Sequence, residues 1–246
     1  MSSPPESILS SVWWRAVVAA RYFGARIGAR HDHYPRLCNV CGYEGFFGPA
    51  GGGLRMDVKC PRCNSAERHR LFKLWLDANT ALIAQAEVLH FAPERGLERL
   101  IRPMANRYTS ADLAPGRADL ALNIERIDMP DASFDVVVCS HVLEHVDDAK
   151  ALAELYRVLR PSGLCLIMAP VVEGWSRTYE NAAIGTPRER TLHFGQHDHV
   201  RIYGADIRDR IRAAGFALSE FTAEGPDVFR LALLPGEKVF VASKPD

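Results

Sequence analysis

Short apolar runs alternate with helical periods from residue 86 onward, and this alternation constrains the fold of the 246-residue chain more than any other feature. The strand candidates are EVLHFA, RYTSAD, FDVVVCS and GLCLIMAP, followed near the end of the chain by FALSEFTA and KVFVASK, with a turn expected at Gly225–Pro226 between the last two. LERLIRPM, DAKALAELYRVLR and a segment ending in AGF have helical periodicity. Such an alternation predicts an α/β fold, in which a doubly wound, mostly parallel sheet carries helices on both faces.

Length and charge set the domain organisation that we expect. A chain of 246 residues with 48% apolar side chains is long enough for one full domain and a small appendage. Residues 1–80 carry 11 basic and 6 acidic side chains, whereas residues 81–246 carry 19 and 24. We therefore expect three parts, namely an N-terminal tail and helix (1–35), a cysteine-rich segment with a connecting helix (36–80) and the α/β domain (81–246). The basic first part permits contact with phosphates or anionic lipid.

A helix is expected over residues 8–29, which are rich in tryptophan, alanine and arginine. Arg15, Arg21 and Arg26 interrupt its apolar stretch too often for a membrane-spanning helix. Two interpretations remain: peripheral membrane contact through Trp13 and Trp14, or packing on the main domain with the arginines exposed. No secretory signal is visible in the sequence.

Four of the six cysteines form two close pairs, Cys38-x2-Cys41 and Cys60-x2-Cys63, separated by 18 residues. This spacing is typical of a tetrahedral four-sulfur site for a structural Zn²⁺, with no coordination position left open. A pair of redox-active dithiols is the competing interpretation. Metal ligation in place of disulfides indicates a reducing compartment, so we expect a cytoplasmic protein. Cys139 and Cys165 lie inside apolar runs and are expected in the core.

The stretch from residue 108 to 171 carries several motifs in a fixed order. Asp112 ends a strand 20 residues after Ala92, where an acid can accept both hydroxyls of a ribose. Met129-Pro130, then Ser133-Phe134-Asp135, and then RVLRPSG at 157–163 follow it. These elements resemble the class I S-adenosylmethionine-dependent methyltransferases, over roughly residues 86–172. The resemblance implies a Rossmann-like fold with a seven-stranded sheet, and S-adenosyl-L-methionine as the cofactor.

The first motif departs from that family, because HFAPERG (90–96) stands where a glycine-rich turn is usual. The sequence resembles a subgroup of these methyltransferases in which HFAPE occurs together with cysteine knuckles, ERHR (67–70) and a late FGQ-x-DHVR-x-YG stretch (194–204). Ala92 is small enough for close approach of the backbone to a cofactor. Pro93 favours a helix start, which leaves the following amides for the methionine carboxylate, and Glu94 can pair with the ammonium group. A dinucleotide would need several converging amides, so the loop disfavours NAD.

Residue by residue, the resemblance implies that Asp112 holds the ribose, that Asn123 and Ile124 flank the adenine, and that Ser140 and His141 lie near the sulfonium. The full set of expected cofactor-binding residues is His90, Ala92, Pro93, Glu94, Asp112, Leu113, Asn123, Ile124, Ser140 and His141. Two further departures are Asn123, where the family usually has an acid, and Ser162, which replaces a glycine.

Residues 171–203 follow the strand GLCLIMAP and are placed to form a lid over the substrate. Histidine is the side chain best suited to act as a base near neutral pH, so His197, His199 and His141 are the catalytic candidates. The lid histidines could instead fix the lid, or bind a second metal through His193, His197 and His199. His145 is expected to pack within a helix.

These features predict a methyltransferase that acts on a small-molecule or glycan acceptor, at oxygen. Two alternatives stay open. An RNA methyltransferase could bind its substrate through the cysteine-rich segment, which would form a zinc ribbon. That segment, however, has no dense Lys/Arg face and no aromatic platform for single-stranded nucleic acid. A non-catalytic interaction module could also retain this fold.

Overall fold

The computed structural model describes residues 16–17, 20, 35–50 and 55–246. Trp13, Trp14 and most of the helix expected over residues 8–29 lie outside the described residues. The chain divides into two compact units, residues 1–35 and 36–246, and every element named below belongs to the second. Among the described residues, no helix is both long enough and apolar enough to cross a membrane. The expected boundary at residues 80 and 81 stays a prediction.

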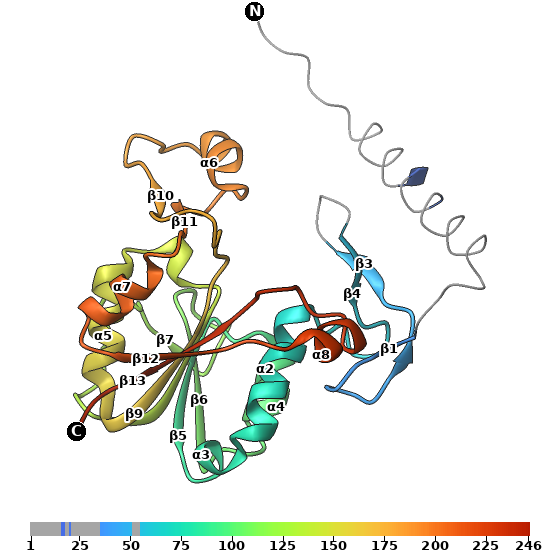
Figure 1. Cartoon of the computed structure of the whole chain (residues 1–246). Coiled ribbons are helices and arrows are strands. Elements are labelled where there is room, and N and C mark those ends of the chain that lie inside the picture. Colours follow the sequence, from blue (N-terminus) through green and yellow to red (C-terminus); the bar gives the residue numbers. More distant parts are fainter. Residues whose placement is uncertain (1–15, 18–19, 21–34, 51–54) are drawn as a thin grey trace, which may run out of the picture. The chain divides into compact units, whose positions relative to one another are not determined.

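A seven-stranded sheet forms the centre of the second unit (Figure 1), and its strand order is β12-β13-β9-β8-β5-β6-β7. Neighbouring strands are parallel except at β13, which is antiparallel to both β9 and β12. The expected doubly wound, mostly parallel sheet is therefore confirmed. The strands are β5 (Glu87–Phe91), β6 (Arg107–Asp112), β7 (Leu120–Ala121), β8 (Phe134–Ser140), β9 (Leu159–Met168), β12 (Ala217–Phe221) and β13 (Val239–Ser243).

Helices cover both faces of this sheet (Figure 1), because successive side chains of a strand point to opposite faces. On β8, Val137 packs with the residues of α5 (Asp148–Val158) and α7 (Ile207–Ala213). Val136 and Val138 pack with α2 (Glu67–Ala78) and α4 (Arg95–Ile101) on the other face. Cys139 and Cys165 are fully buried in the first of these clusters, as expected.

Several short elements were not expected from the sequence. They are α3 (Thr80–Ala84), strand β7, the 3₁₀ helix η1 (Leu143–His145), and α6 (Pro187–Phe194), β10 (Tyr179–Glu180) and β11 (Arg201–Ile202) in the predicted lid. Gly225–Pro226, expected as a turn, instead opens helix α8 (Gly225–Arg230). That expectation was wrong because proline fits the first turn of a helix, where its missing N–H is not needed.

The four cysteines lie in a segment of short hairpins, β1 (Arg36–Leu37) with β2 (Glu44–Gly45) and β3 (Gly48–Ala50) with β4 (Arg55–Lys59). Arg70 of α2 joins this segment to the C-terminal part of the chain. Its fully buried guanidinium donates to the carbonyls of Val58 and Ser65, at 3.0 and 2.9 Å, and to two carbonyls after α8, those of Leu231 and Ala232. Because a buried charge needs such partners, Arg70 fixes the packing of the cysteine segment on the sheet domain.

Candidate active site

Four neighbouring parallel strands, in the order β7-β6-β5-β8, end at the same edge of the sheet. The expected cofactor residues follow these ends. Ala92, Pro93 and Glu94 come after β5, Asp112 and Leu113 at the end of β6, Asn123 and Ile124 after β7, and Ser140 and His141 at the end of β8. The carboxyl edge of such a sheet is where doubly wound folds bind their ligands. The fold therefore gathers residues that lie far apart in the sequence.

Ala92 takes the backbone conformation that explains how this loop manages without its usual glycines. Its φ is +45°, in the left-handed region that favours glycine, and its amide donates to the Ala111 carbonyl at 2.7 Å. Alanine has the smallest side chain that can occupy such a position, and here it is exposed. The turn after β5 thus keeps the shape of a glycine turn at a modest conformational cost.

Glu94 is clamped by the ERHR segment. The Nε of Arg68 lies 2.9 Å from each carboxylate oxygen, and Nε2 of His69 lies 2.9 Å from Oε2. Burial alone would raise the pKa of Glu94, but hydrogen bonds from His69 and Arg68 hold it well below its usual range. Ser140 also donates from Oγ to Oε1, at 3.3 Å. An incoming ammonium group would therefore join a carboxylate that already interacts with Arg68, His69 and Ser140.

Gly96 is the one glycine of this turn, and its role is packing. A Cβ at this position would lie 2.6 Å from Nδ1 of His69. The ring of His69 on α2 therefore sits directly against the start of α4. The absence of a side chain at Gly96 permits the His69–Glu94 contact.

The ends of β6 and β7 present a mixture of polar and apolar groups. Oδ1 of Asp112 accepts from the Ala114 amide at 2.8 Å, which fixes the turn that follows. Leu113 is 73% exposed, which places an apolar surface beside this carboxylate. Oδ1 of Asn123 accepts from the Glu125 amide at 2.9 Å, whereas Ile124 is buried. These positions suit a nucleoside, but its contacts remain predictions.

His90 lies inside the fold and not at its edge. The side chain is fully buried, and Nδ1 is 2.7 Å from the Tyr108 hydroxyl. Burial lowers the pKa of His90 to about 4, so the ring is neutral at physiological pH. The ring of His90 has no exposed surface in this structure. A contact between His90 and a cofactor stays a prediction.

A cavity of about 510 Å³ opens beside the cofactor edge, next to the end of β9. His141 is the only one of the three expected catalytic histidines among its lining residues. The other charged residues that line it were not expected as site residues, although Glu67 and Arg68 belong to the ERHR segment noted in the sequence. They are Arg55, Glu67, Arg68, Glu173, Glu237 and Lys238.

Glu237 and His141 are the two titratable groups of this cavity that suit proton transfer. Among the described residues, neither Oε2 of Glu237 nor Nε2 of His141 has a hydrogen-bond partner, although both atoms are buried. Burial raises the pKa of Glu237 to about 7, and the nearby His141 moderates this effect. Nothing in the sequence pointed to Glu237, because a single acid before an apolar strand is usually a surface residue.

The lid docks on η1 through the FGQHDHVRIYG stretch. The Val200 amide donates to the Glu144 carbonyl at 2.9 Å, and Arg201 donates to the Leu143 carbonyl at 2.8 Å. The Tyr203 hydroxyl donates to Oδ2 of Asp148 at 2.9 Å. Much of this motif therefore holds the end of the lid in place.

The lid histidines separate into different environments. The side chain of His197 is 71% exposed, and Nδ1 of His193 is 2.6 Å from the Tyr179 hydroxyl. His199 instead packs against His145 from η1, with ring centroids 4.6 Å apart. Within the described part of the chain, His193, His197 and His199 do not form a common ligand set, so that alternative is wrong. The catalytic roles of His197 and His199 stay predictions.

The four cysteine sulfurs form one cluster. Sγ of Cys38 is 3.6 Å from that of Cys63, Sγ of Cys41 is 3.6 Å from that of Cys60, and all four lie within 4.8 Å of one another. A tetrahedron of sulfurs around zinc, with bonds of about 2.3 Å, has edges of about 3.8 Å. After each pair the next residue, Gly42 or Asn64, has a positive φ, so the two knuckles turn alike. The cluster therefore fits a zinc ion.

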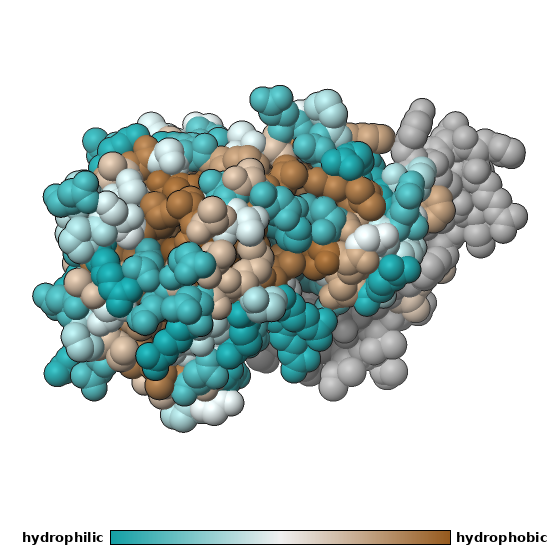
Figure 2. All heavy atoms as spheres, turned by 90° about the horizontal axis from the view of Figure 1, so that it is seen from below, coloured by the Kyte–Doolittle hydropathy of each residue, from teal (hydrophilic) through white to brown (hydrophobic). Residues whose placement is uncertain are grey.

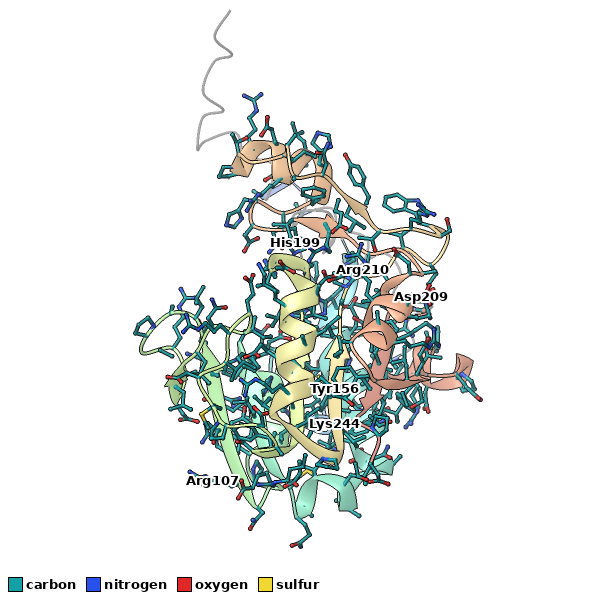
Figure 3. The ribbon with its side chains drawn as sticks, turned by 90° about the vertical axis from the view of Figure 1, so that its left-hand side faces the viewer. Arg107, Tyr156, His199, Asp209, Arg210 and Lys244 are labelled. Atoms are coloured by element: carbon teal, nitrogen blue, oxygen red, sulfur yellow. The ribbon has the colours of Figure 1, made fainter. Side chains whose placement is uncertain are left out.

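A second cavity, of about 750 Å³, lies at the opposite edge of the sheet. Arg107, Phe134 and Arg160 are among its lining residues, and Figure 3 places Arg107 at that end of the sheet. Figure 2 views the molecule from this side, where hydrophilic side chains surround several hydrophobic patches. Because the strands begin here, this cavity is separate from the cofactor edge.

Comparison with known proteins agrees with this geometry. A family described as "Methyltransferase domain" matches residues 95–167. The malonyl-[acyl-carrier protein] O-methyltransferase of Serratia marcescens is 40% identical over 80 residues, which cover 28% of this chain and 31% of that enzyme. The ubiquinone/menaquinone biosynthesis C-methyltransferase of Escherichia coli is 34% identical over 91 residues, covering 35% of this chain and 36% of that enzyme. The matched region thus spans about a third of the length of these relatives.

The fold has a counterpart among solved structures. An S-adenosylmethionine-dependent methyltransferase from Mesorhizobium loti superposes with a TM-score of 0.50 at 15% identity, covering 70% of this chain and 97% of that protein. At this identity the likeness concerns the fold alone. Residues 95–167 thus match a methyltransferase domain, and the fold around them, with its strand order β12-β13-β9-β8-β5-β6-β7, is similar to that of an S-adenosylmethionine-dependent methyltransferase.

Proposed function

We propose that this protein transfers the methyl group of S-adenosyl-L-methionine to an oxygen atom of a small-molecule or glycan acceptor bound in the 510 Å³ cavity. The observation that carries the proposal is the pair of partly buried groups, Glu237 and His141, in a cavity that adjoins the cofactor edge, each with a buried atom that has no hydrogen-bond partner among the described residues. Methyl transfer is an in-line displacement in which the protein chiefly positions the nucleophile. A hydroxyl acceptor also has to lose a proton, and this requires a base close by.

The charge of the cavity favours a polar acceptor. Its lining includes three cationic side chains, Arg55, Arg68 and Lys238, as well as acidic ones. Such groups form hydrogen bonds with hydroxyls, which suits a sugar or a small polar molecule better than an apolar one. The two relatives named above methylate oxygen and carbon respectively, so they leave the acceptor atom open. The presence of a base in the cavity, Glu237, supports oxygen as the acceptor atom, because a hydroxyl has to lose its proton.

The cofactor would be held along the ends of β5 to β8. Asp112 would accept hydrogen bonds from the ribose, Leu113 would contact the adenine, and Ser140 and His141 would face the methionine part. The bound cofactor supplies an electrophilic methyl group. Glu237 has a pKa close to neutral, so it can take up the proton that the acceptor hydroxyl releases, while His141 faces the same cavity.

We also infer that the four cysteines hold a structural Zn²⁺, in keeping with the subgroup that the HFAPE and ERHR segments resemble. Such an ion would fix both knuckles and thereby the hairpin that ends in β4. Arg55, the first residue of β4, lines the cavity. The cysteine segment therefore supplies part of the acceptor site. One zinc per chain, lost when Cys60 is replaced by serine, would support this assignment, and metal-free folded protein would contradict it.

The cofactor assignment is tested by calorimetry with S-adenosylmethionine. Asp112→Ala should weaken binding by about 10- to 100-fold, because hydrogen bonds to a charged group contribute about 1.5–3 kcal/mol each. Asp209→Ala is the matched control, since Asp209 lies on α7 away from the cofactor edge (Figure 3). Equal affinities of both variants would remove the role of Asp112. If the unsubstituted protein does not bind the cofactor, the proposed activity fails.

The acceptor is sought with radiolabelled cofactor and a panel of sugars, glycosides and small hydroxylated molecules. We expect Glu237→Gln to slow methyl transfer while leaving cofactor affinity unchanged. The product identifies the acceptor atom. A methyl group found on nitrogen or carbon would contradict the part of the proposal that concerns oxygen.

A further inference from the structure

Three side chains with metal-binding atoms meet where the lid docks on η1. Glu144 and His145 belong to η1, and His199 comes from the lid. One ligand atom from each lies within 4.8 Å of the other two. The arrangement brings together residues that are more than 50 positions apart in the chain. It also differs from the cysteine cluster in its ligand atoms, which are nitrogen and oxygen.

The carboxylate of Glu144 is buried and incompletely partnered. Its side chain is only 2% exposed, and Oε1 is 3.2 Å from Nδ1 of His141. Oε2 has no hydrogen-bond partner among the described residues. An ionised oxygen in such surroundings is costly unless a cation or donor reaches it. The unpartnered oxygen therefore points to a ligand of positive charge.

We propose that Glu144, His145 and His199 form a binding site for a divalent transition-metal ion. Two imidazoles and one carboxylate are a ligand set that suits zinc and other first-row ions such as iron(II) and cobalt(II). Three protein ligands leave at least one coordination position for water or for an oxygen of a small molecule. This proposal concerns metal binding and does not depend on the proposed methyl transfer.

The surroundings of the three residues provide the support that a metal site needs. Asp198 lies 3.4 Å from Nδ1 of His145, and carboxylates next to metal-binding imidazoles commonly orient the ring. The contacts of Val200 and Arg201 with η1 hold His199 next to this helix. Figure 3 shows His199 between the lid and the adjacent end of α5. An ion at this position would fasten the lid to the sheet domain.

The site also adjoins the acceptor cavity. His141 contacts Glu144 through Nδ1 and lines the cavity. One side chain, that of His141, therefore separates Glu144 from the space assigned to the acceptor. Metal binding and lid docking are then properties of the same group of residues.

The proposal is tested by titrating Co²⁺ into protein that has been loaded with one zinc per chain. Zinc binds thiolates more tightly than cobalt, so the cysteine cluster stays filled. We expect one further equivalent of Co²⁺ to bind, with visible d–d absorption but without a sulfur-to-cobalt charge-transfer band. His145→Ala and His199→Ala should weaken this second binding by at least about 100-fold. His193→Ala and His197→Ala are matched controls from the same lid and should bind as the unsubstituted protein does.

Circular dichroism and retention of the cysteine-bound zinc show that each variant is folded. If His199→Ala is unstable, Glu144→Gln provides an isosteric variant for the same measurement. The proposal is overturned if the zinc-loaded protein takes up no further Co²⁺. It is equally overturned if folded His145→Ala and Glu144→Gln bind Co²⁺ with unchanged affinity.

Discussion

Glu237 offers the sharpest test of the physical argument, because its environment makes a quantitative prediction about stability. Its carboxyl lines the acceptor cavity, and burial raises its pKa from the ordinary value of 4.5 to about 7. Glu237→Gln replaces this acid with an amide of nearly the same shape that cannot ionise. The variant therefore removes one titration and leaves the packing almost unchanged.

The sign and the size follow from proton linkage. Between pH 4.5 and 7 the folded protein holds a proton on Glu237 that the unfolded chain has released, so stability falls as pH rises. A shift of about 2.5 pKa units corresponds to about 3.4 kcal/mol, at 1.36 kcal/mol per unit. The loss of stability is complete well above pH 7, which is about the pKa of Glu237 in the folded protein. It is absent well below pH 4.5, the ordinary pKa that applies to the unfolded chain. Relative to the unsubstituted protein, Glu237→Gln should therefore gain about 2.5 kcal/mol between pH 5 and pH 8.

The assay is urea denaturation of both proteins at several pH values, with the difference in free energy of unfolding plotted against pH. Other titrating groups contribute equally to both proteins and cancel. Glu173→Gln is the control, because Glu173 lines the same cavity while its carboxylate pairs with Arg208. Two parallel stability curves for Glu237→Gln and the unsubstituted protein would refute the reasoning. A rise of methyl transfer through pH 7, lost in Glu237→Gln, would be the matching catalytic result.

Three further substitutions test the packing. Arg70→Met removes the donors of four carbonyls and should cost about 3–5 kcal/mol in urea denaturation, and a loss below about 1 kcal/mol would contradict the structure. Ser162 has a φ of +60°, a strained backbone conformation for serine that glycine adopts freely. Ser162→Gly should therefore raise the free energy of unfolding by about 0.5–1 kcal/mol, and a lower thermal midpoint of this variant would contradict the expected strain. A Cβ on Gly204 would lie 2.6 Å from the Arg177 backbone, so Gly204→Ala should make the lid more sensitive to limited proteolysis, and an unchanged cleavage rate would show that the lid adapts.

The sheet could be predicted from sequence because its pattern is local. Strands such as FDVVVCS at Phe134–Ser140 contain continuous apolar runs, here Val136–Cys139, which is typical of strands buried on both faces. Strand β7, by contrast, has only two residues, Leu120 and Ala121, both exposed, so no periodic pattern marks it. Its existence depends on pairing with β6, which is a tertiary contact.

The cofactor edge was partly predictable for the same reason. Asp112 and Ser140 can be placed at strand ends from the sequence, and the parallel topology then brings them to one edge. The acceptor cavity was not predictable, because the loop before β13 and the start of β4 supply Glu237 and Arg55. Only the fold shows that these two segments, separated by most of the chain, line the same space.

The contacts also explain why certain sequence motifs accompany one another in this chain. A glycine-rich first motif needs no side chains, but HFAPE introduces Glu94, whose partly buried charge requires partners. Arg68 and His69 of the ERHR segment are those partners, and Arg70 of the same segment holds the cysteine hairpins. The cysteine segment, α2 and the cofactor turn are thus one connected assembly. A substitution of Glu94 should therefore disturb the packing of the cysteine hairpins as well as the cofactor edge. In a protein with a conventional glycine turn, a substitution in that turn would disturb the cofactor edge alone.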